Sequence, residues 1–308
     1  MTRPADTTSS GLRVALAQMA PSTSRSESMQ RAVAAIEDAA RQHARLVILP
    51  ELFLSPYFCQ TENPALFSLA EPVPGPATEE LVRVARTHGI SIVASLFEER
   101  APGLYHNTAA VIDPTNGYLG KYRKMHIPDD PLYSEKFYFA PGDLGFKVFE
   151  TAGLRVGVLI CWDQWYPEAA RLTALMGADL LVYPTAIGWH PYEKDSHGKA
   201  QHAAWETMQR SHAVANGCFV AAVNRFGFEP TAEGGSHPEG IEFWGQSFLA
   251  GPDGVIRQKA PVDAAAVLTV PLDLSEIREQ RHGWPFFRDR RVDAYGDLSR
   301  RFLDRDTS

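Results

Sequence analysis

Short apolar runs alternate with longer segments of helical periodicity along most of the chain. The short runs predict strands because they are rich in β-branched residues and too brief for an average helix. They cover residues 13–19, 45–49, 90–98, 154–161, 179–184, 218–224, 244–250 and 267–271. Apolar residues at helical spacing predict helices at 26–43, 78–88, 167–176 and 200–216. The dipeptide Asn116-Gly117, between segments 105–113 and 118–123, predicts a β-hairpin.

This order of elements predicts an α/β fold. Helices and strands alternate in both halves of the chain without a low-complexity linker, so we expect one domain over residues 1–308, with its core at about 11–275. Two sheets of this length would each need a helical cover on one face. They would therefore pack face to face with helices outside, as a four-layer αββα sandwich. The remaining tail, residues 276–308, interleaves Arg with Asp, and we expect it at an oligomer interface.

The composition narrows the function mainly by exclusion. Of 308 residues, 44% are hydrophobic and 22% are charged, which is typical of a globular protein with a large core. The net charge of −7 and the absence of a dense basic run argue against nucleic-acid binding. No apolar stretch approaches the roughly 18 residues of a membrane span, and the polar start has no signal core. We therefore expect neither nucleic acid nor a membrane as a partner.

Cysteine and histidine usage predicts neither a disulfide framework nor a metal site. The three cysteines, Cys59, Cys161 and Cys218, form no CxxC pair, which favours a reducing cytoplasm. Histidines are numerous, but none fits HExxH, and His197 and His202 lie five apart, off the same-face spacing of a helix.

Cys161 ends the apolar run that begins at Leu154 and precedes the polar turn 162–164. A residue at the carboxyl end of a buried strand lies where open α/β sheets place their ligand sites. The next segment starts a helix near Pro167, and amides at this corner would face the sulfur and favour its thiolate. A lone cysteine of this kind is more often a small core residue. Two other segments change that interpretation.

Glu51 also follows a predicted strand, 45–49. Glutamates are usually surface acids. Apolar neighbours on both sides would instead desolvate this carboxylate, which suits a general base. Lys124 lies in a basic cluster directly after the hairpin, and its ammonium would stabilise a thiolate or an oxyanion if it came close to Cys161. Glu135 is a second acid in aromatic surroundings.

These residues supply a thiol, a base and a cation, a set that suits acyl transfer at a carbon-nitrogen bond. Cys161 would attack a carbonyl, Glu51 would pass the thiol proton to the departing nitrogen, and water would release the acyl group. Lys124 and the backbone amide of Trp162 would hold the oxyanion.

The segments around these residues resemble the three signature segments of the nitrilase (carbon-nitrogen hydrolase) superfamily. They are residues 49–51, 122–126 and 157–163, in the family's order, and the likeness runs from residue 13 to about 274. The resemblance implies an αββα sandwich, a triad of Glu51, Lys124 and Cys161, and a second active-site glutamate at Glu135. It also implies that no metal or organic cofactor is needed. Members usually form a homodimer or a higher homo-oligomer.

Further segments resemble the branch of this family that cleaves N-carbamoylputrescine to putrescine, ammonia and carbon dioxide in polyamine biosynthesis. They are residues 55–60, 126–129, 135–143, 161–165 and 183–188. The resemblance implies a small-molecule substrate, a carbamoylated amine. It also implies a pocket lined by Tyr57, Asp129, Tyr133, Trp162, Thr185 and Ala186.

One pocket position departs from that branch. Where the branch generally carries an acid to meet the distal ammonium of its substrate, this chain has His190. A neutral imidazole is a poor counter-ion for an amine. Either Glu193 or Asp195 takes over the role, or the substrate is another compound, such as N-carbamoyl-β-alanine, another N-carbamoyl amino acid or a small aliphatic amide.

Two non-hydrolytic functions are more distant alternatives. A non-catalytic binding subunit would tolerate loss of the triad, which is complete here. A redox-sensing thiol would need a resolving cysteine near Cys161, and Cys59 and Cys218 are both distant in sequence.

Overall fold

Two mixed sheets form the centre of the molecule in the computed structural model, which describes residues 11–231 and 240–304. Among these residues, the first sheet has six strands in the order β15-β1-β2-β3-β4-β5. Its strands are β1 (Leu12–Gln18), β2 (Leu46–Ile48), β3 (Ser91–Ala101), β4 (Leu104–Asp113), β5 (Gly117–Arg123) and β15 (Ala266–Leu272). The predicted hairpin is confirmed as β4 and β5, which pair antiparallel.

The second sheet, within the same described ranges, has the order β14-β13-β10-β8-β7-β6. Its strands are β6 (Lys147–Thr151), β7 (Leu154–Val158), β8 (Leu180–Thr185), β10 (Phe219–Asn224), β13 (Phe248–Ala250) and β14 (Ile256–Lys259). The central strands of both sheets run parallel and the outer ones antiparallel. The carboxyl ends of β7, β8 and β10 therefore lie at one edge of this sheet.

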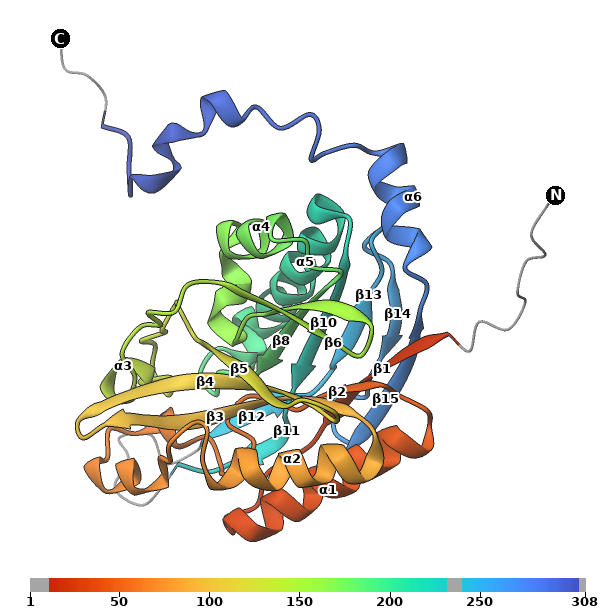
Figure 1. The fold of residues 1–308 in the computed structure, drawn as a ribbon. Coiled ribbons are helices and arrows are strands. Elements are labelled where there is room, and N and C mark those ends of the chain that lie inside the picture. The colour runs from red at the N-terminus through yellow and green to blue at the C-terminus, as the bar shows by residue number, and fades with distance from the viewer. Residues whose placement is uncertain (1–10, 232–239, 305–308) are drawn as a thin grey trace.

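Helices cover the outer face of each sheet, so the predicted four-layer αββα sandwich is confirmed (Figure 1). The first sheet is covered by α1 (Arg25–Arg41) and α2 (Pro76–His88), and the second by α4 (Pro167–Leu175) and α5 (Lys199–Asn216). The close approach of α4 requires a glycine beneath it, because a Cβ at Gly157 would lie 2.4 Å from the Thr173 methyl group. None of the described helices is both long and apolar enough to cross a membrane.

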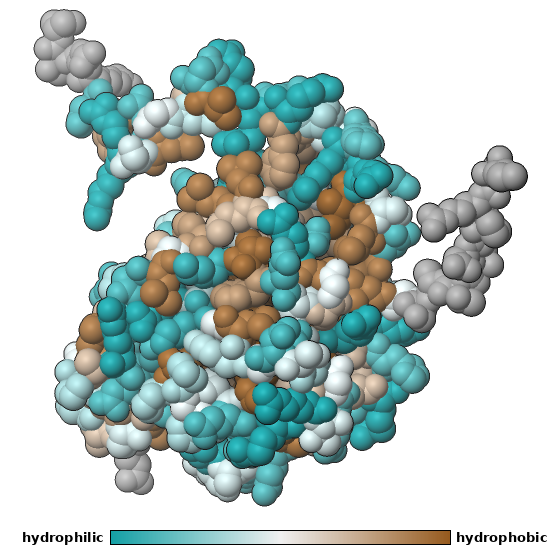
Figure 2. Space-filling model, viewed as in Figure 1, coloured by the Kyte–Doolittle hydropathy of each residue, from teal (hydrophilic) through white to brown (hydrophobic). Residues whose placement is uncertain are grey.

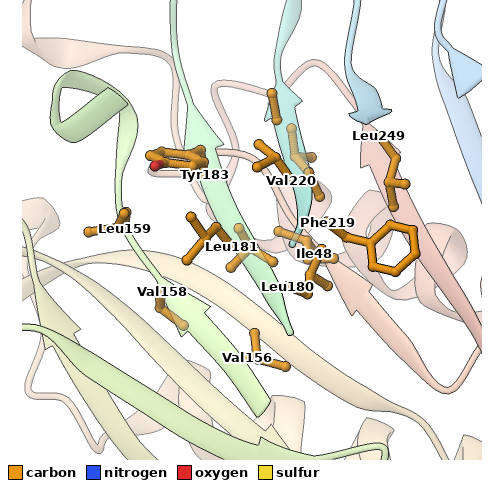
Figure 3. Close-up of a cluster of buried hydrophobic side chains, with 14 of the residues drawn as sticks. Ile48, Val156, Val158, Leu159, Leu180, Leu181, Tyr183, Phe219, Val220 and Leu249 are labelled. Atoms are coloured by element: carbon orange, nitrogen blue, oxygen red, sulfur yellow. The ribbon is translucent and has the colours of Figure 1, made fainter. Parts of the chain in front are cut away.

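Strand alternation divides the core into two clusters. In β1, Val14 and Leu16 point into the space between the sheets, whereas Ala15 and Ala17 pack under α1 and α2. Figure 3 shows Ile48 of β2 among Leu180, Phe219 and other side chains of the second sheet. This apolar layer between the sheets fixes one sheet against the other.

A predicted strand at 244–250 is wrong, because the chain changes sheet within it. Trp244 ends β12 (Ile241–Trp244), which forms a third, small sheet with β9 (Gly188–Trp189) and β11 (Phe226–Glu229), while Phe248 begins β13. Gly245 and Gln246 both have φ of 58°, which turns the backbone out of an extended path. Apolar residues on both sides of this turn made the two strands look continuous.

The shorter elements are the other departures from the pattern. They are α3 (Glu135–Tyr138), α6 (Ser275–Gly283), a π-helical turn (Lys194–Gly198) and 3₁₀ turns at Phe58–Gln60, Pro64–Leu69, Cys161–Trp165, Val292–Ala294 and Gly296–Ser299. The predicted strand 154–161 is also shortened, because β7 ends at Val158. Beyond α6 the described part of the tail runs past the body of the molecule (Figure 1), with Val292, Leu298 and Phe302 more than 60% exposed.

Candidate active site

Cys161 lies at a sharp corner between β7 and α4. Its backbone has φ of 40°, a left-handed conformation that is uncommon for a residue with a side chain. Asp163 holds this corner, since its buried carboxylate accepts bonds from the Ile160 amide at 2.9 Å and the Tyr122 hydroxyl at 2.7 Å. His126 adds a ring nitrogen 2.7 Å from the same carboxylate. The strained turn is thus fixed from several directions and presents the sulfur at the edge of the sheet.

Glu51 follows β2 of the other sheet and is fully buried. Its Oε1 accepts hydrogen bonds from Asn107 Nδ2 at 2.7 Å and from Lys124 Nζ at 2.8 Å. Ser95 donates to Asn107 Oδ1, which turns the Asn107 amide group toward the carboxylate. Glu51 Oε2 is buried and has no hydrogen-bond partner among the described residues. One oxygen is therefore anchored, and the other is left to accept a proton.

Lys124 lies between two carboxylates. Its Nζ is 2.8 Å from Glu51 Oε1 and 2.6 Å from Glu135 Oε2, and all three side chains are almost completely buried. Burial by itself lowers the pKa of the ammonium, but the charges of Glu135 and Glu51 outweigh it and raise the pKa well above its usual value. Lys124 is therefore a permanent buried cation.

Glu135 begins α3 and accepts a second hydrogen bond, from the Tyr57 hydroxyl at 2.7 Å. Burial, with the negative charge of Glu51 nearby, raises the pKa of Glu135 to about 7, although Lys124 and Tyr57 act in the opposite direction. Glu135 thus holds Lys124 through a hydrogen bond in addition to the one that Lys124 donates to Glu51.

The burial of Cys161 disfavours the expected thiolate. Burial raises the pKa of the thiol well above its usual value, the charge of Glu51 adds to this, and Lys124 offsets only part of it. The Sγ–H group donates weakly to the Ala186 carbonyl oxygen at 3.8 Å. A neutral thiol needs a base at the moment of attack, and Glu51 is the nearby carboxylate with an oxygen that has no partner among the described residues.

A cavity of about 430 Å³ leads to this group of residues. Cys161 and Glu135 lie in its wall, together with four of the residues predicted to contact the substrate: Tyr133, Trp162, Ala186 and His190. The aromatic side chains of Trp165 and Trp244 complete much of its apolar surface. That these four residues contact the substrate stays a prediction, which their place in the cavity wall allows.

Three predicted pocket residues do not line this cavity. Asp129 points to solvent, with its side chain 53% exposed and 3.8 Å from Lys136, and Asp130 takes its place in the wall. Tyr57 lies behind Glu135. Thr185 is fully buried, and its hydroxyl donates to the Tyr183 carbonyl at 2.8 Å.

Two supporting residues were missed from the sequence. Asn107 orients Glu51, as described above. Arg225 is fully buried, donates to the Glu51 carbonyl at 2.6 Å and pairs with Glu229 at 2.8 Å. Arg225 directly follows β10, which lies in the same sheet as β7, the strand that precedes Cys161. Its position after a predicted strand could therefore have marked it as a candidate site residue. Among the described residues, no cluster of three or more acidic, histidine or cysteine side chains is suited to hold a metal.

Comparisons with known proteins agree with this geometry. Residues 13–282 match the family model described as carbon-nitrogen hydrolase. N-carbamoylputrescine amidase of Solanum lycopersicum is 43% identical over 92% of this chain and 93% of its own length. Citrullinase of Francisella tularensis is 36% identical over 94% and 99%. The crystal structure of a carbon-nitrogen hydrolase from Helicobacter pylori G27 superposes with a TM-score of 0.91, at 44% identity over 95% and 99%.

Proposed function

The chain belongs to the carbon-nitrogen hydrolase family, and we propose that it hydrolyses the ureido group of N-carbamoylputrescine to give putrescine, ammonia and carbon dioxide. One observation carries this proposal. A buried thiol, Cys161, lies in the wall of a cavity beside a buried Glu51–Lys124–Glu135 group, in a chain 43% identical to plant enzymes with this activity.

The first half of the reaction forms a covalent intermediate. Cys161 Sγ attacks the ureido carbon while Glu51 Oε2 takes the thiol proton, so a carbon–sulfur bond forms as the carbonyl becomes an oxyanion. When the adduct collapses, one carbon–nitrogen bond breaks and Glu51 returns the proton to the leaving nitrogen. The product is a carbamoyl thioester on Cys161.

The oxyanion needs donors that are already in position. The Lys124 ammonium and the backbone amide of Trp162 fill this role in our proposal. Because Lys124 is held by two carboxylates at 2.8 and 2.6 Å, it requires little reorganisation when the negative charge develops.

The second half of the reaction repeats the chemistry with water. Glu51 deprotonates a water molecule that attacks the thioester carbon, and the sulfur leaves and is reprotonated. The carbamate that is released loses carbon dioxide and frees the second nitrogen as an amine. The net reaction consumes one water molecule. A second is consumed only when the carbon dioxide is hydrated to bicarbonate.

The proposal is tested by an ammonia-release screen of the purified protein. The compounds are N-carbamoylputrescine, N-carbamoyl-β-alanine, citrulline and small aliphatic amides. We expect N-carbamoylputrescine to have the highest kcat/KM, with putrescine formed in equal amount to ammonia. Turnover of the simple amides without turnover of any ureido compound would overturn the substrate assignment.

We also propose that the protein works as a homo-oligomer. Leu172 and Leu175 of α4 and Met176, which directly follows it, are each more than 40% exposed. Figure 2 shows apolar side chains gathered on the face of the molecule below the tail. A groove of about 760 Å³ separates α4 and α5 from the tail residues Phe286 and Tyr295. Sedimentation of the full chain should give at least a dimer, which Leu172→Asp would weaken. A native monomer at micromolar concentration would contradict this proposal.

The compartment we propose is the cytoplasm. Cys59, Cys161 and Cys218 are all free and buried, which suits a reducing environment.

A further inference from the structure

We infer that Glu193, assisted by His190, binds the distal ammonium group of the substrate and thereby selects ureido compounds with a cationic end. This inference rests on the proposed function and adds a specificity-determining residue to it. In the branch that cleaves N-carbamoylputrescine, an acid at the position of His190 generally has this role. In this chain we assign the role to Glu193.

The charges around the cavity favour a cation. Asp130, Glu135 and Glu193 lie in its wall, and no lysine or arginine does so among the described residues. Glu135 is already paired with Lys124 at 2.6 Å, and Asp130 is exposed. Glu193 is half-buried and is therefore the wall acid best placed to act in a partly desolvated environment.

Glu193 is held in a defined position from both its backbone and its side chain. Its carbonyl accepts from the His197 amide at 2.7 Å and the Gly198 amide at 3.0 Å in the π-helical turn before α5. Gln201 Nε2 donates to Oε2 at 2.6 Å. This bond uses one carboxylate oxygen, so the other can accept from an ammonium. Single π-turns are frequent at functional sites, because they change the direction in which a side chain points.

His190 adds a second polar group to the same cavity wall as this acid. Both of its ring nitrogens are buried without a hydrogen-bond partner among the described residues, and the side chain lines the cavity. Buried polar atoms without partners are rare in folded proteins, so this ring points to a ligand group. An ammonium has three donors and can bond to both the imidazole and the carboxylate.

Much of the cavity wall is apolar and suits a methylene chain. Trp162, Trp165 and Trp244 are among the residues that line it. Aromatic faces pack against methylene groups and also attract a cation, whereas a carboxylate gains nothing from them. A substrate ending in a carboxylate would find Glu193 and Asp130, but no lysine or arginine, in the described wall. The same cavity therefore favours a carbamoylated amine and disfavours a carbamoylated amino acid.

Three ureido compounds of similar length test the inference. They are N-carbamoylputrescine, N-pentylurea, in which a methyl group replaces the ammonium, and 4-ureidobutyrate, which ends in a carboxylate. Glu193→Gln removes the charge but keeps an acceptor for Gln201. We expect its kcat/KM for N-carbamoylputrescine to fall about 10- to 100-fold, mainly through KM, while that for N-pentylurea changes less than about twofold.

The matched control is Asp195→Asn, which removes an exposed carboxylate from the same segment outside the cavity wall. It should leave all three substrates unchanged. The alkylation rate of Cys161 by iodoacetamide, followed by mass spectrometry, checks that the catalytic end of each variant is intact.

The outcomes separate this inference from the proposed function. If the native protein releases ammonia from none of the three compounds, the proposed function fails. If it turns over N-carbamoylputrescine and N-pentylurea equally well, or if Glu193→Gln lowers both by the same factor, the function stands and the role of Glu193 is refuted. A loss of selectivity in Asp195→Asn instead would also refute it.

Discussion

The catalytic residues and the proposed ammonium-binding residues, here called the catalytic and the distal end of the site, are built in different ways. At the catalytic end, Glu51 and Lys124 follow strands, Glu135 begins a short helix, and all three are almost completely buried. Lys124 bonds to both carboxylates, at 2.8 and 2.6 Å. At the distal end, His190 and Glu193 lie on a half-exposed segment that contains a π-helical turn. The rigid end contains the groups that make and break bonds. The looser end contains the groups that recognise the rest of the substrate, so it can change without loss of the reaction.

The largest effect should come from removing the nucleophile at the rigid end. Cys161→Ala should lower kcat by at least about 10⁴-fold, because no covalent intermediate can then form. Steady-state ammonia release measures the loss, and circular dichroism should show an unchanged fold. Substantial activity in a folded Cys161→Ala variant would refute nucleophilic catalysis.

A smaller loss should follow from Lys124→Arg. The guanidinium keeps the charge but is larger and planar, and it cannot occupy the fully buried site between Glu51 and Glu135. Loss of one oxyanion donor costs about 10²- to 10³-fold in kcat. We expect the thermal midpoint to fall as well, because the site is closely packed. Full activity would show that a positive charge alone is enough at this end.

The protonation state of the thiol can be tested by pH. Because burial and Glu51 raise the pKa of Cys161, the thiolate fraction should stay small up to the usual titration range of a free thiol, near 8.5. The iodoacetamide alkylation rate of Cys161 should therefore keep rising by about tenfold per pH unit up to pH 9. A plateau below pH 8 would mean that Lys124 holds a thiolate instead.

The smallest effect should come from the distal end. His190→Glu adds an acid next to Glu193 and should raise the preference for N-carbamoylputrescine over N-pentylurea by about two- to fivefold, with kcat little changed. The ratio of the two kcat/KM values is the measurement. A change in kcat of the same size would show that the distal end also affects the chemical step, which would contradict this division of roles.

The catalytic end could be predicted from the sequence because it depends on strand ends. Glu51 and Cys161 each follow an apolar run that forms a strand, one in each sheet, and the carboxyl ends of such strands are where ligand sites lie. The elements that were missed had weak patterns. β14, Ile256–Lys259, is a largely polar edge strand, and the switch at Gly245 between β12 and β13 is hidden by apolar neighbours.

The errors at the site have a different origin. The thiolate expectation took account of the helix start and Lys124, but the depth of burial of Cys161 is a tertiary property that spacing does not give. Asp129 and Asp130 are adjacent, and only the fold decides which of them faces the cavity. Arg225 donates to the Glu51 carbonyl although the two residues are 174 positions apart, so their contact could not be predicted from local sequence.

Asp163 links the two halves of the sandwich at the position where chemistry occurs. It belongs to the corner that carries the sulfur, yet it bonds to Tyr122 of the opposite sheet. A slight sliding of one sheet over the other would therefore displace the reacting atom before the strands themselves separate. Heat or denaturant should therefore abolish catalytic activity while most of the backbone is still ordered.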